Sequence, residues 1–204
     1  MPPVPKPEIL ISVDVEASGP SPGTGSLIAI GACLVDDPEA SFYREVQPIP
    51  DRPWDPRTER IHGLTPARLV EQGVPPARAM ADFAAWLADV AGAGVPVFVG
   101  FNAPFDWMFV ADYFHRFLGH NPFGYAAMDL KAVYLGRYGL TRWAQTTKRH
   151  VGKRHAVSLR HTHHALDDAR MQAALARELL RPAGPTVATS AGPSTPAADA
   201  SESA

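Results

Sequence analysis

The chain has 204 residues, of which 46% are hydrophobic and 20% are charged, and this composition suffices for one globular core. A formal net charge of -2 excludes a protein that coats nucleic acid through bulk positive charge, so a nucleic-acid partner must be held by a local patch. The single cysteine, Cys33, excludes an internal disulfide, and its apolar neighbours indicate a buried, unreactive thiol.

The N-terminal part of the chain predicts a lead-in followed by three strands. Residues 1–8 contain four prolines and are expected to be disordered. They lack the long apolar run of a signal peptide or membrane span, so we predict a cytoplasmic protein that does not contact a membrane. Apolar runs over 9–15, 27–35 and 41–46 are typical of strands, and the turn-forming segments between them favour an antiparallel meander.

The rest of the chain alternates helix and strand. A short helical turn over 58–61 precedes Thr65 and Pro66, which have the order of a helix N-cap and first helical residue. Apolar spacing then predicts helices over 76–90, 104–118, from about 130, and over 165–180, with strands over 95–101 and 124–128. This order predicts an α/β fold with a mixed central β-sheet flanked by helices. Residues 182–204 are rich in Pro, Ala, Ser and Thr and are expected to form a disordered tail, which leaves one domain over 9–181.

Two carboxylates stand out on the first predicted strand. Asp14 and Glu16 are two residues apart, so their side chains point to the same face, while Val13 and Val15 point to the other. An apolar strand seldom aims two acids at or beside a core unless something cationic meets them there. A solvated edge strand is the alternative explanation for this pair.

A third acid, Asp106, lies in the first turn of the 104–118 helix. The helix dipole alone favours an acid at this position, so a plain helix-end carboxylate is one explanation. However, Phe109, Val110 and Tyr113 follow Asp106 at helical spacing and place it on the apolar face of the helix. We therefore expect this face, with Asp106 on it, to press against the sheet.

The last predicted helix carries two adjacent acids that face different ways. Asp168 shares a stripe with Leu175 and other apolar residues, whereas Asp167 shares a side with Arg170, so Asp168 is predicted to point inward. His163 precedes this helix and, taken alone, has the features of an ordinary loop histidine.

The four inward acids, Asp14, Glu16, Asp106 and Asp168, are predicted to meet in one pocket. Like charges this close cannot all ionise in a low-dielectric cleft without compensation. Two divalent cations balance four carboxylates, and all-oxygen ligands favour Mg²⁺ or Mn²⁺. Two such ions about 4 Å apart suit phosphodiester hydrolysis. Because histidine changes charge near neutral pH, His163 is a suitable general base for the attacking water.

The segment from Lys131 to His164 contains eight Lys and Arg residues and no Asp or Glu. It is either a solvated basic loop or a strip that holds phosphates beside the acidic centre. Trp143 and Tyr138 interleave with these cations and offer faces for base stacking. A zinc site within residues 161–164 is a further alternative, disfavoured because no thiolate or second histidine motif accompanies it.

Three stretches of the sequence resemble, in order, the exonuclease motifs of the DEDDh branch of 3′-5′ exonucleases, the group of bacterial polymerase proofreading subunits and ribonuclease T. They cover residues 14–16, 102–106 and 163–168, and the resemblance spans about residues 9–180. It implies a ribonuclease H-like fold and an exonuclease domain over 9–181. It also implies that Asp14, Glu16, Asp106 and Asp168 are metal ligands and that His163, five residues before the last aspartate, is the base.

The resemblance also suggests substrate contacts. It implies that Asn102 and Phe105 shape the pocket and that His62, in the stretch 62–65, belongs to a substrate-side loop. Many family members carry two threonines against the terminal nucleotide where this chain has Ala17 and Ser18, so its contact with the 3′ end is expected to differ.

These observations predict a metal-dependent 3′-5′ exonuclease that uses two Mg²⁺ or Mn²⁺ ions to release nucleoside 5′-monophosphates from single-stranded RNA or DNA. One rival is a non-catalytic nucleic-acid-binding module on the same fold, and another is a metal-dependent phosphatase of small monoesters. Some relatives dimerise, and the sequence is compatible with either a homodimer or a monomer.

Overall fold

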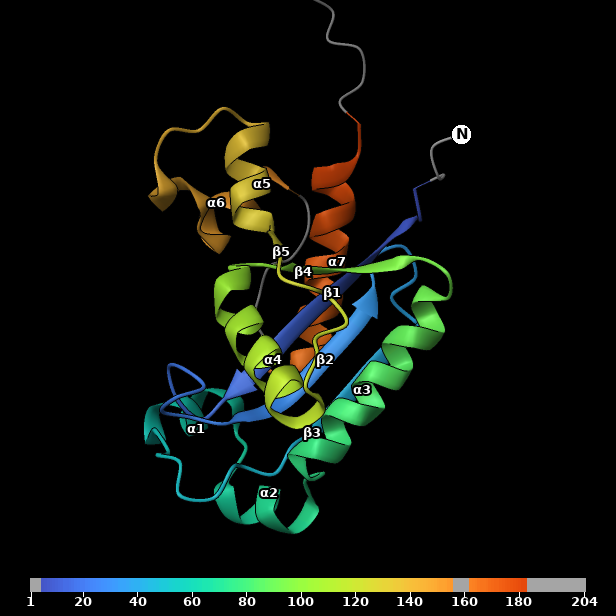
Figure 1. Ribbon diagram of the computed structural model, residues 1–204. Coiled ribbons are helices and arrows are strands. Elements are labelled where there is room, and N and C mark those ends of the chain that lie inside the picture. The colour runs from blue at the N-terminus through green and yellow to red at the C-terminus, as the bar shows by residue number, and fades with distance from the viewer. Residues whose placement is uncertain (1–4, 156–161, 183–204) are drawn as a thin grey trace, which may run out of the picture.

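A computed structural model describes residues 5–155 and 162–182 of the protein. Its centre is a mixed five-stranded sheet with the strand order β3-β2-β1-β4-β5 (Figure 1). The strands are β1 (Glu8–Ala17), β2 (Leu27–Leu34), β3 (Ser41–Glu45), β4 (Val95–Gly100) and β5 (Ala127–Asp129). The first three strands form the predicted antiparallel meander. On the other side of β1, β4 pairs with β1 in parallel, and β5 pairs with β4 in parallel. The predicted α/β fold with a mixed central sheet is confirmed.

Helices cover both faces of this sheet. In Figure 1, α3 (Pro76–Ala91) and α4 (Ala103–Leu118) lie in front of it, and α7 (Ala165–Leu180) lies behind. Alternation along β1 separates the two layers, because Val13 and Val15 join the core cluster of α3 and α4. On the other face, the Ser12 hydroxyl donates to the Ala169 carbonyl of α7 at 2.8 Å. The face of β1 that carries Asp14 is therefore the face covered by α7.

Cys33 lies in the core behind the sheet. It is fully buried among apolar side chains, and this burial raises its pKa to about 12. The prediction of a buried thiol is confirmed.

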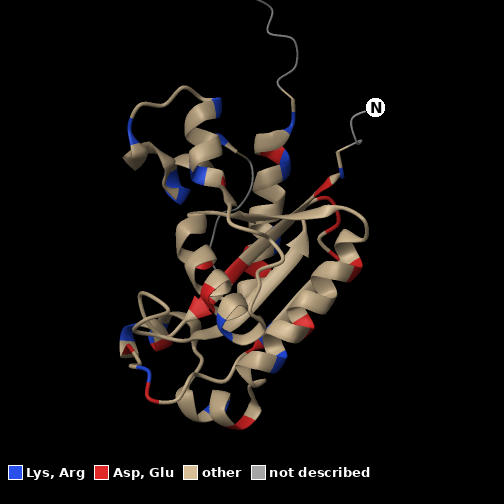
Figure 2. Ribbon diagram, viewed as in Figure 1, with Lys and Arg blue, Asp and Glu red and all other residues tan. Residues whose placement is uncertain are grey.

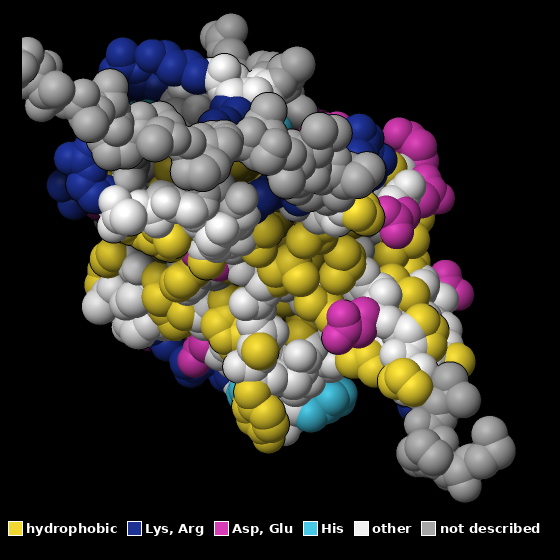
Figure 3. All heavy atoms as spheres, turned by 90° about the horizontal axis from the view of Figure 1, so that it is seen from above, with side chains coloured by type: hydrophobic (Ala, Val, Ile, Leu, Met, Phe, Trp, Pro, Cys, Tyr) yellow, Lys and Arg dark blue, Asp and Glu magenta, His cyan; other side chains and the backbone are white. Residues whose placement is uncertain are grey.

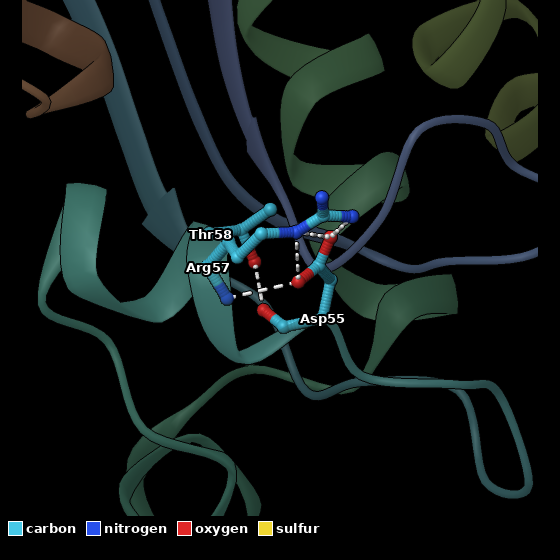
Figure 4. Close-up of polar contacts among 3 residues, drawn as sticks. All are labelled: Asp55, Arg57 and Thr58. Atoms are coloured by element: carbon cyan, nitrogen blue, oxygen red, sulfur yellow. Dashed lines mark hydrogen bonds and ion pairs between the residues drawn. The ribbon is translucent and has the colours of Figure 1, made fainter.

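Two short helices precede α3. The first, α1 (Pro56–His62), begins at the Asp55 N-cap, whose carboxylate accepts the Arg57 N–H and pairs with the Arg57 guanidinium at 2.8 Å (Figure 4). It ends before Gly63, which adopts φ 72°, a value that suits glycine at a helix end. The second helix, α2 (Pro66–Gln72), begins after Thr65, whose side chain accepts the Arg68 N–H, as the sequence predicted.

Three elements fill the basic segment. They are α5 (Leu130–Arg137), the 3-10 turn η1 (Trp143–Thr146) and α6 (Lys148–Arg154). Only the start of α5 was predicted, because η1 and α6 are short and lack a long apolar stripe. Part of this segment, residues 156–161, lies outside the described residues.

Some predicted boundaries are wrong. The lead-in is shorter than predicted, because β1 begins at Glu8 and the Pro7 carbonyl accepts the Val95 N–H of β4. The last strand begins at Ala127 rather than residue 124, since it pairs only with Phe98–Gly100. Residues 1–4 and the predicted tail from residue 183 onward lie outside the described residues. Within the described ranges, no helix has the length and apolar character needed to cross a membrane.

Candidate active site

The site forms where β1 loses one of its two neighbours. The parallel partner β4 pairs with β1 as far as Ser12, and the chain then turns into α4, while β2 stays paired through Ala17. The Val15 N–H is left without a strand partner on the β4 side, and the Asp106 carboxylate accepts it at 3.0 Å. This hydrogen bond places Asp106, from the first turn of α4, beside the acids of β1.

The turn between β4 and α4 is held by an aspartate of β5. Asn102 adopts φ 69°, in the left-handed region that asparagine tolerates better than most residues. The Asn102 and Ala103 N–H groups donate to the Asp129 carboxylate at 3.0 and 3.3 Å. The Asn102 side-chain oxygen accepts from Lys131 Nζ at 3.1 Å, so its orientation is fixed from the basic segment.

The fourth acid arrives through a close approach of α7 to the sheet. Gly31 of β2 lies opposite Asp14, and a Cβ on Gly31 would lie 2.2 Å from the Leu166 nitrogen. Glycine is therefore required where α7 begins. On the first turn of this helix Asp168 is 1% exposed, whereas Asp167 is exposed to solvent. The helical stripe predicted this division correctly.

These elements enclose one cavity of about 430 Å³ that contains all five residues predicted to act in catalysis. Glu16, His163 and Asp168 each offer a ligand atom, and the three atoms lie within 4.8 Å of one another. The cavity is lined by Asp14, Val15, Glu16, Phe101, Asn102, Phe105, Asp106, Lys131, Thr147, Lys148, His163 and Asp168.

Burial raises the pKa values of three of the four acids, Asp14, Glu16 and Asp106. The pKa of Asp14 lies well above its usual value, first because of burial and then because of the charges of Asp106, Glu16 and Asp168. The pKa of Glu16 rises to about 7, first through burial and then through the charges of Asp168 and Asp106. Burial likewise raises the pKa of Asp106 to about 7, although the Val15 N–H opposes the shift.

The donor set fits divalent cations. Asp14, Asp106 and Asp168 are 8%, 5% and 1% exposed, so bulk water cannot solvate their charges. Lys148 faces them, and burial lowers its pKa even though the four acids oppose this shift. One lysine cannot balance four carboxylates. The carboxylate oxygens of the four acids match hard ions such as Mg²⁺ or Mn²⁺.

Sequence reasoning missed Gln172, which connects three elements of the site. It is 1% exposed, its amide nitrogen donates to Asp14 Oδ1, and its amide oxygen accepts the Phe101 N–H at 2.9 Å. It thereby links α7 to β1 and to the end of β4. One available signal was its position four residues after Asp168, on the same helical face.

We expect Gln172→Leu to weaken both folding and ion binding. Loss of the amide leaves the Phe101 N–H and Asp14 without their buried partner, which lowers the free energy of unfolding by about 1–3 kcal/mol. Removing a support of a metal ligand typically costs 10- to 100-fold in affinity or activity, so we expect about tenfold weaker Mg²⁺ binding by calorimetry. Glu178→Leu, on the same helix and outside the cavity lining, is the control. Unchanged Mg²⁺ affinity in Gln172→Leu would show that Gln172 does not support Asp14.

The structure brings only some of the predicted substrate residues to the site. Asn102 and Phe105 line the cavity. Ala17 and Ser18 are buried and are not among the described residues that line it, and the Ser18 hydroxyl instead accepts the Ser26 N–H at 2.8 Å. Their predicted contact with a 3′ end therefore has no geometric support, because the hydroxyl closes the loop after β1.

His62 lies in an adjoining cavity of about 380 Å³ that shares Glu16 and His163 with the first. Its Nδ1 accepts the Leu64 N–H at 3.0 Å, which leaves the hydrogen on Nε2. That nitrogen is buried and has no hydrogen-bond partner among the described residues. Burial also lowers the pKa of His62, so it is a neutral donor.

The two histidines before α7 have different surroundings. His163 has φ 57°, a left-handed conformation that is uncommon for residues other than glycine, and it lines both cavities. His164 stacks on Tyr43 with ring centroids 4.4 Å apart and lies 3.6 Å from the Asp167 carboxylate. Residue 161, part of the alternative zinc site, lies outside the described residues.

Comparison with known proteins establishes the family. The family model described as an exonuclease, RNase_T, matches residues 11–176, a stretch that includes all four acids and His163. The chain belongs to this exonuclease family. The exonuclease is 42% identical over 171 residues to Cap18 of Escherichia coli, a 3′-5′ DNA exonuclease, and the match covers 83% of this chain and 90% of Cap18. The predicted resemblance to 3′-5′ exonucleases is thus confirmed.

Solved structures show that the fold is shared. The nuclease domain of 3′hExo, a DEDDh family member bound to rAMP, matches the exonuclease with a TM-score of 0.69 and 14% identity, over 84% of this chain and 91% of that domain. Escherichia coli Exonuclease I in complex with a dT13 oligonucleotide matches with a TM-score of 0.65 and 19% identity. This match covers 84% of the present chain but only 41% of Exonuclease I. The predicted ribonuclease H-like fold is confirmed.

Proposed function

We propose that this exonuclease removes nucleotides from the 3′ end of single-stranded DNA and releases nucleoside 5′-monophosphates. The observation that carries the proposal is the convergence of Asp14, Glu16, Asp106, Asp168 and His163 in one cavity. The 42% identity to a 3′-5′ DNA exonuclease supports the direction of attack and favours DNA over RNA.

In this proposal, Asp14, Glu16, Asp106 and Asp168 hold two divalent ions, Mg²⁺ or Mn²⁺. When bound, the two ions supply Lewis acidity that activates water and stabilises charge on the leaving oxygen. The protein contributes a fixed set of ligands: the Val15 N–H orients Asp106, and Gln172 orients Asp14. A rigid ligand set reduces the reorganisation that would otherwise accompany the reaction.

His163 acts as the general base. An imidazole nitrogen takes a proton from the attacking water, whose oxygen forms a bond to the phosphorus. The bond between phosphorus and the 3′ oxygen breaks, and that oxygen leaves as the new 3′ hydroxyl after it takes up a proton. Because His163 is exposed and borders both cavities, it can exchange its proton with solvent between cycles.

The terminal nucleotide is proposed to contact Asn102, Phe105 and His62. Phe105 lines the catalytic cavity with an aromatic surface, and Asn102 lies beside it. His62 lines the adjoining cavity, and its Nε2, which has no hydrogen-bond partner among the described residues, is a donor that suits a phosphate or sugar oxygen. Ala17 and Ser18 remain candidates only for backbone contacts, and a homodimer remains a prediction from the resemblance.

The experiment that tests this function compares end-labelled single-stranded DNA, single-stranded RNA and duplex DNA with Mg²⁺. We expect mononucleotides to appear fastest from single-stranded DNA, with EDTA abolishing their release. A blocked 3′ end should prevent cleavage, and rapid cutting of the blocked strand would indicate an endonuclease. Phosphate release from small monoesters would support the rival phosphatase, and binding without cleavage would support the non-catalytic module.

The raised pKa values predict a pH-dependent stability in the absence of metal. Folding raises the pKa values of Glu16 and Asp106 to about 7, so the folded state holds these protons more tightly than the unfolded chain. Their stabilising protonation is complete below the ordinary pKa near 4 and is lost as the pH rises through about 7. The melting temperature of the EDTA-treated protein should therefore fall between about pH 5 and pH 8.

Mg²⁺ should restore more stability at pH 8 than at pH 5, because the ion binds ionised carboxylates. Scanning fluorimetry with and without Mg²⁺ measures both effects. Asp106→Asn keeps an oxygen for the Val15 N–H and should flatten the pH dependence. If the melting temperature of Asp106→Asn fell with pH as steeply as that of the wild type, Asp106 would not be a source of the pH dependence.

A further inference from the structure

One part of the protein has strong positive charge that the reaction centre does not explain. Residues 130–155, here called the basic module, comprise α5, η1 and α6 and contain seven Lys and Arg residues but no Asp or Glu. Figure 2 shows blue and no red on α5, α6 and the connection between them. In Figure 3, Lys and Arg gather at the upper left, whereas most visible Asp and Glu lie at the right.

Five of the seven cations of the basic module have no carboxylate partner among the described residues. Elsewhere, seven arginines pair with a carboxylate within 4.0 Å: Arg44, Arg57, Arg68, Arg78, Arg116, Arg170 and Arg181. In the module, Lys131, Arg142, Arg149, Lys153 and Arg154 have no such partner among the described residues. Uncompensated charge of this kind attracts a polyanion.

The basic module also forms one wall of the catalytic cavity. Lys131, Thr147 and Lys148 line the same cavity as the acids. Lys148 begins α6, and its Nζ lies 5.4 Å from the centre of the Phe101 ring. A strand whose 3′ end lies among the acids therefore meets the module directly.

Positive charge continues outward from this wall along α6. A separate cavity of about 360 Å³ is lined by Lys153 and Arg154, together with Tyr134, Leu140, Gln145 and His150. Lys148 and Lys153 are five residues apart, which is about 7 Å along the axis of a helix and roughly 140° around it, so they line separate cavities on different sides of α6. Phosphates of one strand repeat every 3.4 Å or so in a stacked helix, so a strand needs at least about two nucleotides to pass from the first cavity to the second.

Trp143 adds a surface for an unpaired base. Its side chain is 51% exposed, and Lys131 Nζ lies 4.6 Å from its ring centre. Lys131 also binds Asn102 at the cavity rim, so Trp143 is tied to the edge of the catalytic site. Stacking on an aromatic ring requires a base that is not paired in a duplex.

From these observations we propose that the basic module binds the single strand on the 5′ side of the nucleotide being removed. Lys153 and Arg154 contact its phosphates, and Trp143 stacks on one of its bases. This inference rests on the proposed exonuclease function and extends it, because it assigns a binding surface for the part of the strand that is not cut.

The test compares two substrate lengths. Lys153→Gln/Arg154→Gln is assayed with Mg²⁺ on a single-stranded DNA of roughly 12 nucleotides and on a dinucleotide without a 5′ phosphate, whose one phosphate is the group that is cleaved. We expect kcat/KM on the long strand to fall about tenfold or more, mainly through KM, with the dinucleotide rate unchanged. Arg78→Gln/Arg116→Gln changes the net charge equally on α3 and α4 and is the matched control.

Salt dependence gives a second readout. Each phosphate contact to a single strand contributes about 0.7 to the slope of log affinity against log salt concentration. Loss of two contacts should reduce the slope by about 1.4 in fluorescence anisotropy with Ca²⁺ in place of Mg²⁺. Trp143→Ala should weaken binding of the long strand with little change in this slope.

The outcomes separate the two proposals. Equal losses on both substrates, or no loss on either, would overturn the role of the basic module. The role would also be overturned if the control double variant lost as much affinity as Lys153→Gln/Arg154→Gln. Absence of hydrolysis of either substrate by the wild-type protein would instead refute the proposed function.

Discussion

Replacing Asp14 with Asn is expected to lower the rate of DNA hydrolysis by about 10³-fold or more. The substitution removes a charge from the centre of the four-acid cluster, and the loss of several kcal/mol of electrostatic stabilisation corresponds to this factor. The fold should persist, because the Asn amide oxygen can still accept from Gln172. The measurement is single-turnover cleavage of a labelled single strand with saturating Mg²⁺.

Metal-free stability distinguishes loss of function from loss of fold in this variant. Burial and three neighbouring acids disfavour ionised Asp14. Asp14→Asn should therefore melt at the wild-type temperature or higher in EDTA, but gain less from Mg²⁺. Asp167→Asn is the matched control, because Asp167 is exposed beside the buried Asp168 and should be dispensable. Near-normal hydrolysis by Asp14→Asn would exclude the metal-ligand assignment.

Replacing His163 with Ala is expected to reduce kcat by about 10²- to 10⁴-fold, the usual contribution of a general base. The four acids remain in place, so Mg²⁺ binding measured by calorimetry should be largely preserved. A merely structural role for His163 would instead weaken Mg²⁺ binding and lower the melting temperature together with kcat.

His164→Ala is the control for the neighbouring histidine. His164 stacks on Tyr43 and lies beside Asp167, so its loss should affect stability slightly and kcat little. If His163→Ala keeps near-normal turnover, or if His164→Ala shows the larger loss, the assignment of the base is wrong.

The segments that carry the clustered acids were predictable from local periodicity. Two-residue spacing on β1 placed Asp14 and Glu16 on one face, and helical spacing separated inward Asp168 from outward Asp167. Both arguments need only the geometry of one element. The order of the three motifs then indicated which family to expect, because each motif alone is common but the set is specific.

Contacts between distant elements were not predictable in this way. The bond from the Val15 N–H to Asp106 exists because β4 ends before β1 does, which is a consequence of strand register. Gly31 is required because α7 crosses the sheet at that point, and nothing in its own strand indicates this. Gln172 likewise acquires its role only when α7, β1 and β4 meet.

The sequence by itself determined the alternation of strands and helices, the inward face of each and the chemical types available at the site. The tertiary structure alone decided that Ser18 closes a loop instead of facing the cavity, and that Lys131 and Lys148 line the same cavity as the acids. The physical reason is the range of the interactions. Periodic burial is encoded within a few residues of chain, whereas the meeting of side chains more than 90 positions apart depends on how whole strands and helices pack.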